Sequence, residues 1–235
     1  MMSARTHPPG SISPDPPVQR LRMRYGKRGD ARFIGHLDVA RFWERVFRRV
    51  GLPLAYSHGF NPQPRIQFAS ALSVGIEGEN ELADIFLDER VEPAFWLERI
   101  RQTLPDGFVV HDLVEVPLKL PSMQSALRAA VYEVSFRPPP DVAAMEERVQ
   151  ALLARRTILR PHHKRPERQV DLRPLILWLG VRGGDERVVV EMTLKAGQQG
   201  NARVSDVLEV LGLDPLQVRV VRKALILEES APEEE

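Results

Sequence analysis

The sequence predicts an α+β protein made of two tandem ferredoxin-like domains, each with the element order β-α-β-β-α-β. Three observations support this fold class. Short segments alternate apolar and polar residues as strands do, longer segments repeat apolar residues with a helical period, and the same order of segments occurs twice. The 235 residues are enough for two small domains. We expect a first domain at 20–119 and a second at 128–228, between a disordered leader at 1–19 and an acidic tail at 229–235.

The clearest element is a helix over residues 36–50, "HLDVARFWERVFRRV". At about 100° per residue, its large apolar side chains fall on one face. They are Val39, Phe42, Trp43, Val46, Phe47 and Val50. Gly51 and Pro53 follow and end the helix.

The other elements of the first unit are recognised by alternation and by turn residues. A strand "RLRMRY" begins at Arg20, and "GKRGD" supplies the turn after it. Pro93 falls in the first turn of the second helix, where proline is favoured. The remaining predicted segments are extended pieces at 54–56 and 65–69, a turn "GIEGENE" at 75–81, a strand at 82–87, a helix at 92–104 and a strand at 107–116.

The second unit repeats this order without obvious sequence identity to the first. Residues 173–181 and 187–194 form a hairpin across "RGGDE". A helix at 203–212 opens with a Ser or Asp cap, from "RVSD". The other predicted elements are a strand at 129–136, a helix at 140–155 and a strand at 218–227.

Charge is segregated along the chain although the formal net charge is only +1. Residues 20–65 hold eleven Arg or Lys against three Asp or Glu, and residues 77–115 hold eleven acidic residues against three arginines. Residues 155–173 are basic again, with seven cations against two acids. Such segregation creates a field that attracts a polyanion, unless the blocks neutralise each other in the fold.

The chain contains no cysteine. Disulfides, thiolate zinc sites and a cysteine nucleophile are therefore excluded, and the chain cannot bind an iron–sulfur cluster through thiolates. Hydrophobic residues make up 43% of the chain, but no apolar run reaches the roughly 20 residues of a membrane span. The leader lacks the apolar core of a secretion signal, so we expect a cytoplasmic protein.

Four arginines lie on an arc of the 36–50 helix opposite its apolar face: Arg41, Arg45, Arg48 and Arg49. Arginine presents paired donors to phosphate oxygens, so this arc is a candidate for binding nucleic acid. Arg22, Arg24, Lys27 and Arg28 are close in sequence and are expected to extend it. The alternatives are a solvated helix surface, or a face that docks on the acidic segment 77–115.

The loop "SHGFNPQPRI" at 57–66 follows this helix. Pro62 and Pro64 restrict the backbone, so the loop presents its polar side chains at low entropic cost. The candidate binding residues are His58, Asn61, Gln63 and Arg65. Tyr56 and Phe60 offer faces for stacking, although for Phe60 we favour a place in the core.

His36 and His58 are the candidate acid–base residues, because histidine titrates near neutral pH. A nucleophile or oxyanion donor cannot be located, so no catalytic residue is assigned and a non-catalytic role is favoured.

A secondary basic loop within residues 160–169 contains His162, His163, Lys164 and Arg165, without the ligand spacing of a metal site. "GQQGNAR" at 197–203 is a weak candidate for binding an anion. Motifs for nucleotide hydrolysis and dinucleotide binding are absent.

The stretch from Arg32 to Leu87, "RFIGHLDVARFWERVFRRVGLPLAYSHGFNPQPRIQFASALSVGIEGENELADIFL", resembles the radical-SAM-linked family of bacterial proteins. This family is a domain of unknown function that occurs alone or fused C-terminal to cobalamin-binding radical-SAM proteins. Its pattern RF-x-S-HLD…YS-x-GFNP-x-P is matched almost without gaps, with Gly35 where a Ser is common. The resemblance continues through "GQQGNARVSDVLEVLGL", where Arg203–Val204 replaces a usual Arg-Pro pair.

The resemblance implies association with a cobalamin-binding radical-SAM protein, which would carry the iron–sulfur cluster, SAM and cobalamin. We therefore expect a non-catalytic accessory protein that binds an anionic substrate such as tRNA or rRNA. One alternative is a metal-independent endoribonuclease, by analogy with RAMP-type enzymes that use paired ferredoxin-like domains. The other is a protein–protein interaction module whose basic face docks on an acidic protein.

Overall fold

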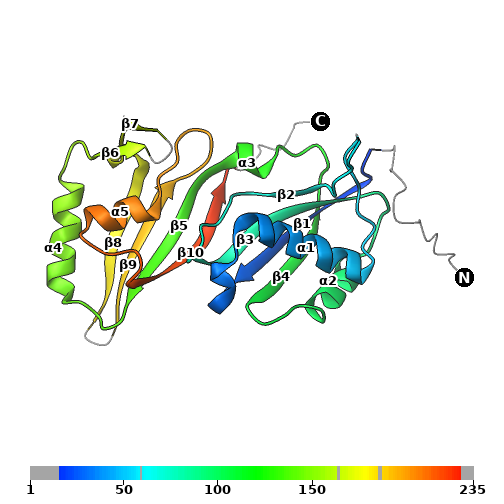
Figure 1. Ribbon diagram of the computed structural model, residues 1–235, viewed down its shortest axis with the longest axis horizontal. Helices are drawn as coiled ribbons and strands as arrows, with labels where there is room; N and C mark the ends of the chain where they lie inside the picture. The colour runs from blue at the N-terminus through cyan, green and yellow to red at the C-terminus, as the bar shows by residue number, and fades with distance from the viewer. Residues whose placement is uncertain (1–15, 59, 163–164, 185–186, 229–235) are drawn as a thin grey trace, which may run out of the picture.

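The computed structural model describes residues 16–58, 60–162, 165–184 and 187–228, and these residues form a mixed α+β protein with one large sheet (Figure 1). The strands are β1 (Gln19–Lys27), β2 (Ile66–Phe68), β3 (Glu77–Leu87), β4 (Phe108–Val116), β5 (Leu127–Phe136), β6 (Leu159–His162), β7 (Arg165–Asp171), β8 (Ile176–Gly184), β9 (Arg187–Lys195) and β10 (Val218–Leu227). The α-helices are α1 (His36–Val50), α2 (Pro93–Arg101), α3 (Met123–Ala126), α4 (Val142–Leu153) and α5 (Val204–Val210). Short 3-10 helices cover Gly29–Phe33 and Arg173–Leu175.

Eight strands form one continuous sheet in the order β4-β1-β3-β10-β5-β9-β8, with β2 pairing with β3. The strands of the first half therefore have the order β4-β1-β3-β2, and those of the second half have the order β10-β5-β9-β8. The halves join where β10 runs parallel to β3, through Val221 opposite Glu77 and Arg222 opposite Gly78. All the other strand pairs in the sheet are antiparallel.

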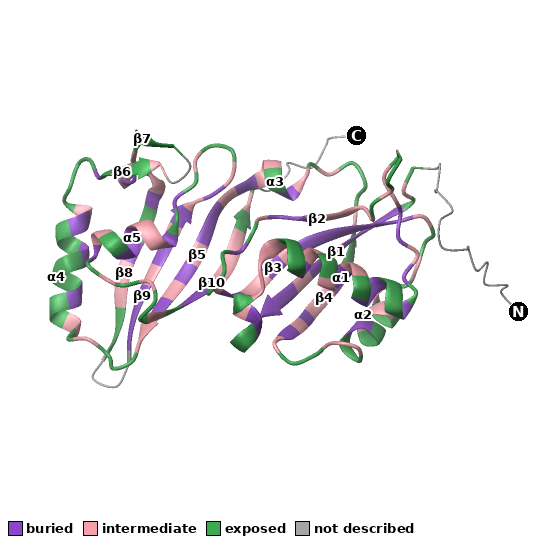
Figure 2. Cartoon of the chain, viewed as in Figure 1, coloured by how far each residue is buried: buried purple, intermediate pink, exposed green. Residues whose placement is uncertain are grey.

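Each half has its own apolar core. One cluster of buried side chains runs from Leu21 to Leu113 and includes the inner face of α1, and the other runs from Leu127 to Val220 and includes the inner faces of α4 and α5. Figure 2 shows buried and less buried positions alternating along the strands, and exposed outer surfaces on the helices. The expected domain bounds, 20–119 and 128–228, stay a prediction.

Helix α1 forms over the predicted residues, because its apolar face meets the sheet. Trp43 and Phe47 are fully buried there, and their rings stack at 5.7 Å between centroids. Gly51 ends the helix with a φ of 78°, a left-handed conformation that glycine adopts without a steric penalty.

The helices of both halves pack on the same side of the sheet. Tyr25 of β1 belongs to the core beneath α1, and Glu81 lies opposite Tyr25 on β3. Glu81 binds Arg222 of β10, and Arg222 lies opposite Tyr132, which belongs to the core beneath α4 and α5. Because directly opposed residues point to the same face of a sheet, this face is continuous across the two halves. Figure 1 shows α1, α2 and α5 in front of the strands.

Two sequence predictions are wrong because cross-strand pairing overrides local turn signals. The expected turn at 75–81 belongs mostly to β3, which begins at Glu77 and is paired with β1 on one side and β10 on the other. The expected basic loop at 160–169 contains the paired strands β6 and β7, with Leu159 opposite Asp171 and His162 opposite Arg165. His163 and Lys164 of that loop lie outside the described residues.

Helix α5 also begins differently from the prediction. Arg203 occupies the residue before the helix and makes no side-chain cap, whereas Ser205 and Asp206 lie within the first turn. The expected leader falls on residues 1–19, but β1 already begins at Gln19; residues 1–15 and the tail at 229–235 lie outside the described residues. None of the helices in the described ranges has the length and apolar character that crossing a membrane requires.

Candidate functional site

The four arginines of the α1 arc are all exposed, but their local partners differ. Arg41 forms an ion pair with Asp38 at 3.1 Å, and Arg48 forms one with Glu44 at 2.8 Å. Arg45 and Arg49 make no hydrogen bond or ion pair with any other described residue. The arc is therefore not docked on the acidic segment 77–115, and two of its cations are available to a ligand.

The loop that follows α1 is closed by its own backbone. The amide of Ser57 donates to the carbonyl of Gln63 at 2.8 Å, and the amide of Gln63 donates to Oγ of Ser57 at 3.0 Å. Below them, Tyr56 pairs with Pro64, and the amide of Arg65 donates to the carbonyl of Ala55 at 2.8 Å. These contacts fix the two arms of the loop, and the described residues between the arms, His58, Phe60 and Asn61, are exposed.

Tyr56, the residue before the loop, lies against the last turn of α1. The guanidinium of Arg48 is 5.7 Å from the ring centre of Tyr56, a cation–π contact that joins the arginine arc to the base of the loop. His58, Asn61 and Gln63 are exposed on the loop. The structure therefore brings these three candidate residues together with the C-terminal end of the arc.

Phe60 does not fill the core, contrary to our expectation. Its relative exposure is 111%, the highest of the large apolar side chains in the described part of the chain. The residues flanking the loop, Tyr56 and Phe68, pack against the first core instead, so the core is filled without Phe60. The ring of Phe60 is therefore accessible, and a partner that covers it would remove this apolar surface from water.

Arg65 lies on a different face from the arc. Phe68 packs in the core beneath α1, so alternation along the strand turns Arg65 to the opposite face. There its guanidinium is 4.8 Å from the ring centre of Phe86, which Arg20 also contacts at 5.3 Å. The structure therefore separates Arg65 from the arginines with which the sequence grouped it.

The cations of β1 do not extend the α1 arc either. Arg22 binds Asp84 at 2.8 Å, and Arg24 forms an ion pair with Asp112. Lys27 is only 1% exposed and donates to the carbonyl of Ile34 at 3.0 Å. Burial is the main cause that lowers the pKa of this lysine.

The acidic segment 77–115 neutralises strands rather than α1. Besides the aspartates that bind β1, it supplies three glutamates of β3 that pair with β10: Glu77 with Arg219, Glu79 with Lys223 and Glu81 with Arg222. The segregated charge of the sequence is thus largely used to join strands.

His36 and His58 do not form one site. His36 lies in the first turn of α1, edge-on to Phe68 with 5.5 Å between ring centroids. Tyr56, two residues before His58, contacts the last turn of α1, and the rise of a 15-residue helix puts that turn about 20 Å from the first one. Burial, followed by the positive charges of Arg222 and Lys27, lowers the pKa of His36. This histidine is therefore neutral at pH 7.

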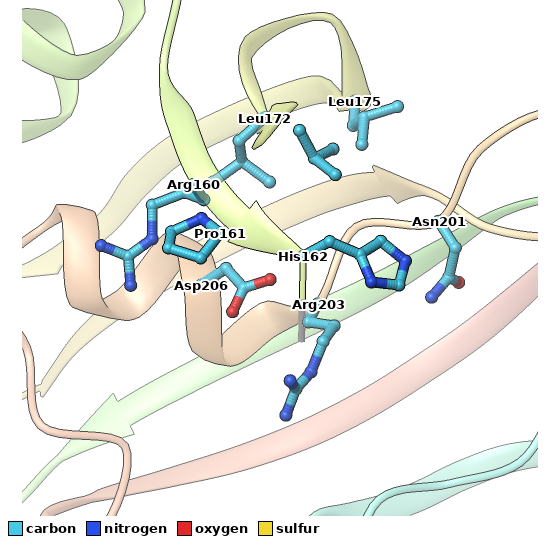
Figure 3. A pocket seen from close by; sticks show the side chains of 9 residues that line it. Arg160, Pro161, His162, Leu172, Leu175, Asn201, Arg203 and Asp206 are labelled. Atoms are coloured by element: carbon cyan, nitrogen blue, oxygen red, sulfur yellow. The ribbon is translucent and has the colours of Figure 1, made fainter. Parts of the chain in front are cut away.

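A small cavity lies in the second half, between the β6–β7 hairpin and residues 201–206 (Figure 3). Its volume is about 110 Å³, and its polar lining is Arg160, His162, Asn201, Arg203 and Asp206. The segments that form it are some forty residues apart in sequence, which is why sequence reasoning considered them separately and missed the site. Arg165 is exposed on β7 beside the hairpin tip. The described residues contain no group of three or more His, Cys, Asp or Glu that would hold a metal ion.

The fold and the exposed cationic surface define an α+β protein with a candidate ligand-binding face. The chain belongs to the DUF2344 family, described as uncharacterized protein conserved in bacteria, whose sequence model matches residues 20–204. A search of curated proteins found no match. The family description names neither an activity nor a partner, so the expected link to cobalamin-binding radical-SAM proteins stays a proposal.

Proposed function

We propose that this chain is a non-catalytic accessory protein that binds RNA. The binding face is the α1–loop surface, which consists of Arg41, Arg45, Arg48, Arg49, His58, Phe60, Asn61 and Gln63. The observation that carries the proposal is the fully exposed ring of Phe60, held at the tip of a closed loop beside the exposed arginines of α1. Single-stranded nucleic acids bind to surfaces that combine cationic groups with aromatic rings.

The arginines supply the electrostatic part of the interaction. Arg45 and Arg49 have no partner among the described residues, so a phosphate group gains their charge without breaking an existing ion pair. Each phosphate that is neutralised releases condensed counterions, so binding weakens as the salt concentration rises. Arg41 and Arg48 are paired only to exposed or half-exposed acids of the same helix, and such pairs contribute little.

Phe60 supplies a stacking face. Stacking of one base on an aromatic side chain contributes about 1–3 kcal/mol and tolerates any base. The two prolines and the closed base of the loop mean that little conformational freedom is lost when the ring binds. His58, Asn61 and Gln63 surround the tip and present hydrogen-bonding groups to a base or a sugar.

The partner we propose is a cobalamin-binding radical-SAM protein, to which this chain delivers RNA. The support is the close match to the HLD and GFNP motifs of the radical-SAM-linked family; since this sequence has no cysteine, the partner would supply the thiolates of any iron–sulfur cluster. We further propose that the chain consists of two ferredoxin-like units. The support is that each half has the strand order of a β-α-β-β-α-β unit, with helices following the first and third strands.

The experiment is an equilibrium titration of fluorescently labelled tRNA and of an unstructured RNA oligonucleotide, at several salt concentrations. We expect Arg45→Ala combined with Arg49→Ala to weaken binding and to reduce the slope of log K against log salt by about 1 for each lost phosphate contact. Phe60→Ala should weaken binding to the oligonucleotide by about tenfold or more, with the slope unchanged.

The matched control is Arg182→Ala. Arg182 is exposed and pairs with Glu191 on β8–β9, on the sheet face opposite the helices, so its loss removes one positive charge elsewhere and matches Arg45→Ala and Arg49→Ala taken singly. Binding that is absent, or that falls equally in the control and in the α1 variants, contradicts the proposal. Co-purification with an acidic protein in the absence of nucleic acid, together with no response to added RNA at any salt concentration, would instead support an interaction module.

A further inference from the structure

The cavity between the β6–β7 hairpin and the start of α5 combines apolar walls with a few polar groups. Pro161, Leu172 and Leu175 line one part of it (Figure 3). At about 110 Å³ it is several times smaller than the roughly 300–1,000 Å³ pockets that take drug-sized ligands. It therefore suits one flat ring system better than a whole nucleotide.

Two charged side chains in this cavity are unused by the fold. Arg203 and Asp206 are three residues apart, yet their side chains form no ion pair with each other and no hydrogen bond or ion pair with another described residue. Asn201 lies beside them and adds an amide with both a donor and an acceptor. Arg160 binds Glu209 with one nitrogen, while its Nε is buried without a hydrogen-bond partner. Arg203 and Asn201 are exposed and Asp206 is partly exposed, so all three groups are accessible to a ligand.

The charges favour a neutral ligand over an anion. Arg160 is paired with Glu209, and the lining holds one further guanidinium, Arg203, and one carboxylate, Asp206, so the formal charges of these four groups cancel; His162 is the remaining ionisable side chain of the lining. A phosphate group would meet the carboxylate of Asp206 at close range, which is unfavourable. The lining therefore favours a neutral, flat ligand that has hydrogen-bond donors and acceptors next to each other on one edge and apolar ring faces.

We propose that this cavity binds the guanine base of a nucleotide that is extruded from single-stranded RNA. The carboxylate of Asp206 accepts from N1–H and N2–H of guanine, and the guanidinium of Arg203 donates to O6 and N7. The apolar residues cover the faces of the ring, as in other pockets for extruded bases. This inference rests on the proposed RNA binding and defines a substrate preference for it.

The placement of the cavity fits this role. It is formed in part by the start of α5, which packs on the same side of the sheet as α1. The α1–loop surface lies on the first half and the cavity on the second, so an RNA strand that crosses the helical side meets both (Figure 1). In this arrangement the α1–loop surface contributes affinity for any RNA sequence, and the cavity contributes the preference for guanine.

The test compares uridine-rich RNA 12-mers that carry one central guanosine, adenosine or inosine. We expect the guanosine oligonucleotide to bind about tenfold more tightly than the adenosine one, since a paired contact to a base discriminates by roughly that factor. Inosine lacks the N2 amino group and should lose much of the preference. Asp206→Asn and Arg203→Gln should each remove the preference and leave the salt slope unchanged, whereas Ser205→Ala, in the same turn, should retain it.

A second measurement separates the two proposals. GMP, AMP and inorganic phosphate are titrated separately against the full chain, with the methyl NMR signals of Leu172 and Leu175 as the readout. GMP alone should shift them, and the shift should vanish in Asp206→Asn. Equal shifts by all three ligands, or RNA binding without guanosine preference, overturns the guanine site and leaves RNA binding intact. GMP shifts without any RNA binding support the guanine site and contradict the proposed function.

Discussion

Arg222 of β10 donates from two guanidinium nitrogens to the carboxylate of Glu81 of β3, and both side chains are only 3% exposed. The same guanidinium donates to the carbonyl of Ala71 at 3.1 Å. Burial alone would lower the pKa of Arg222, but the adjacent Glu81 carboxylate raises it above its ordinary value. The Arg222–Glu81 ion pair joins the two halves of the sheet at the junction of β3 and β10, where only two residues of each strand are paired.

Arg222→Met is expected to destabilise the protein by about 3–5 kcal/mol, because the carboxylate of Glu81 stays buried without a partner. The double variant Glu81→Met with Arg222→Met should be less destabilised than the single one. Chemical denaturation of both variants measures the difference. A double variant as unstable as Arg222→Met would show that the buried charge is not the cause.

Arg219→Gln is the matched test at the rim of the same junction. Arg219 binds Glu77 at 2.8 Å; the side chain of Arg219 is 58% exposed, whereas that of Glu77 is 4% exposed and has Arg32 as a second partner at 3.6 Å. Because solvent screens the Arg219 guanidinium and Glu77 keeps Arg32, we expect a loss of no more than about 1 kcal/mol in the free energy of unfolding. That loss should shrink further in 1 M salt, where the Debye length is about 3 Å. A cost equal to that of Arg222→Met would contradict the assignment of junction stability to the buried pair.

The lowered pKa of His36 predicts a pH-dependent stability. In the window between the lowered value in the folded state and the ordinary value of about 6.5, the unfolded chain binds more protons than the folded one. The free energy of unfolding should therefore fall as the pH falls through this window. His36→Gln should remove this part of the slope, and His58→Gln, on the exposed loop, is the control. Identical pH profiles for wild type and His36→Gln would contradict the prediction.

The positions of the two histidines predict that the protein does not cleave RNA. His36 and His58 lie near opposite ends of α1, so they are not expected to act as an acid–base pair. Labelled RNA incubated with the protein in EDTA should stay intact between about pH 5 and 8, the range over which histidine titrates. Cleavage that is lost in His36→Gln or in His58→Gln would instead establish the endoribonuclease alternative.

Local patterns in the sequence predicted the elements that depend on local interactions. The bounds of α1 and β10 follow from periodicity and turn residues, and the structure has them as predicted. The N-terminal part of β3 was missed, because Glu77 and Gly78 are ordered by Arg222 and other residues some 140 positions away. Pairing at that separation leaves no local signal.

The same division holds for the candidate site: features set by local spacing were predicted, and features set by contacts between distant segments were not. The arc of arginines follows from helical spacing, and the exposed polar residues of the loop follow from its turn chemistry. The opposite facing of Arg65 depends on strand alternation in β2, which only a known register could have supplied. The cavity near Arg203 required two distant segments to meet, and the exposure of Phe60 required knowing that its neighbours already fill the core.

One edge of β3 is divided between two partners, since β2 covers its C-terminal part and β10 covers its N-terminal part. An uncovered strand edge is a template for pairing with other chains, and proteins that leave one open tend to aggregate. Neither half would close this edge alone, because one covering strand comes from each. This edge of β3 is thus covered only when both halves are joined, and cutting the chain between the halves would expose hydrogen-bonding edges on β3 and β10 together.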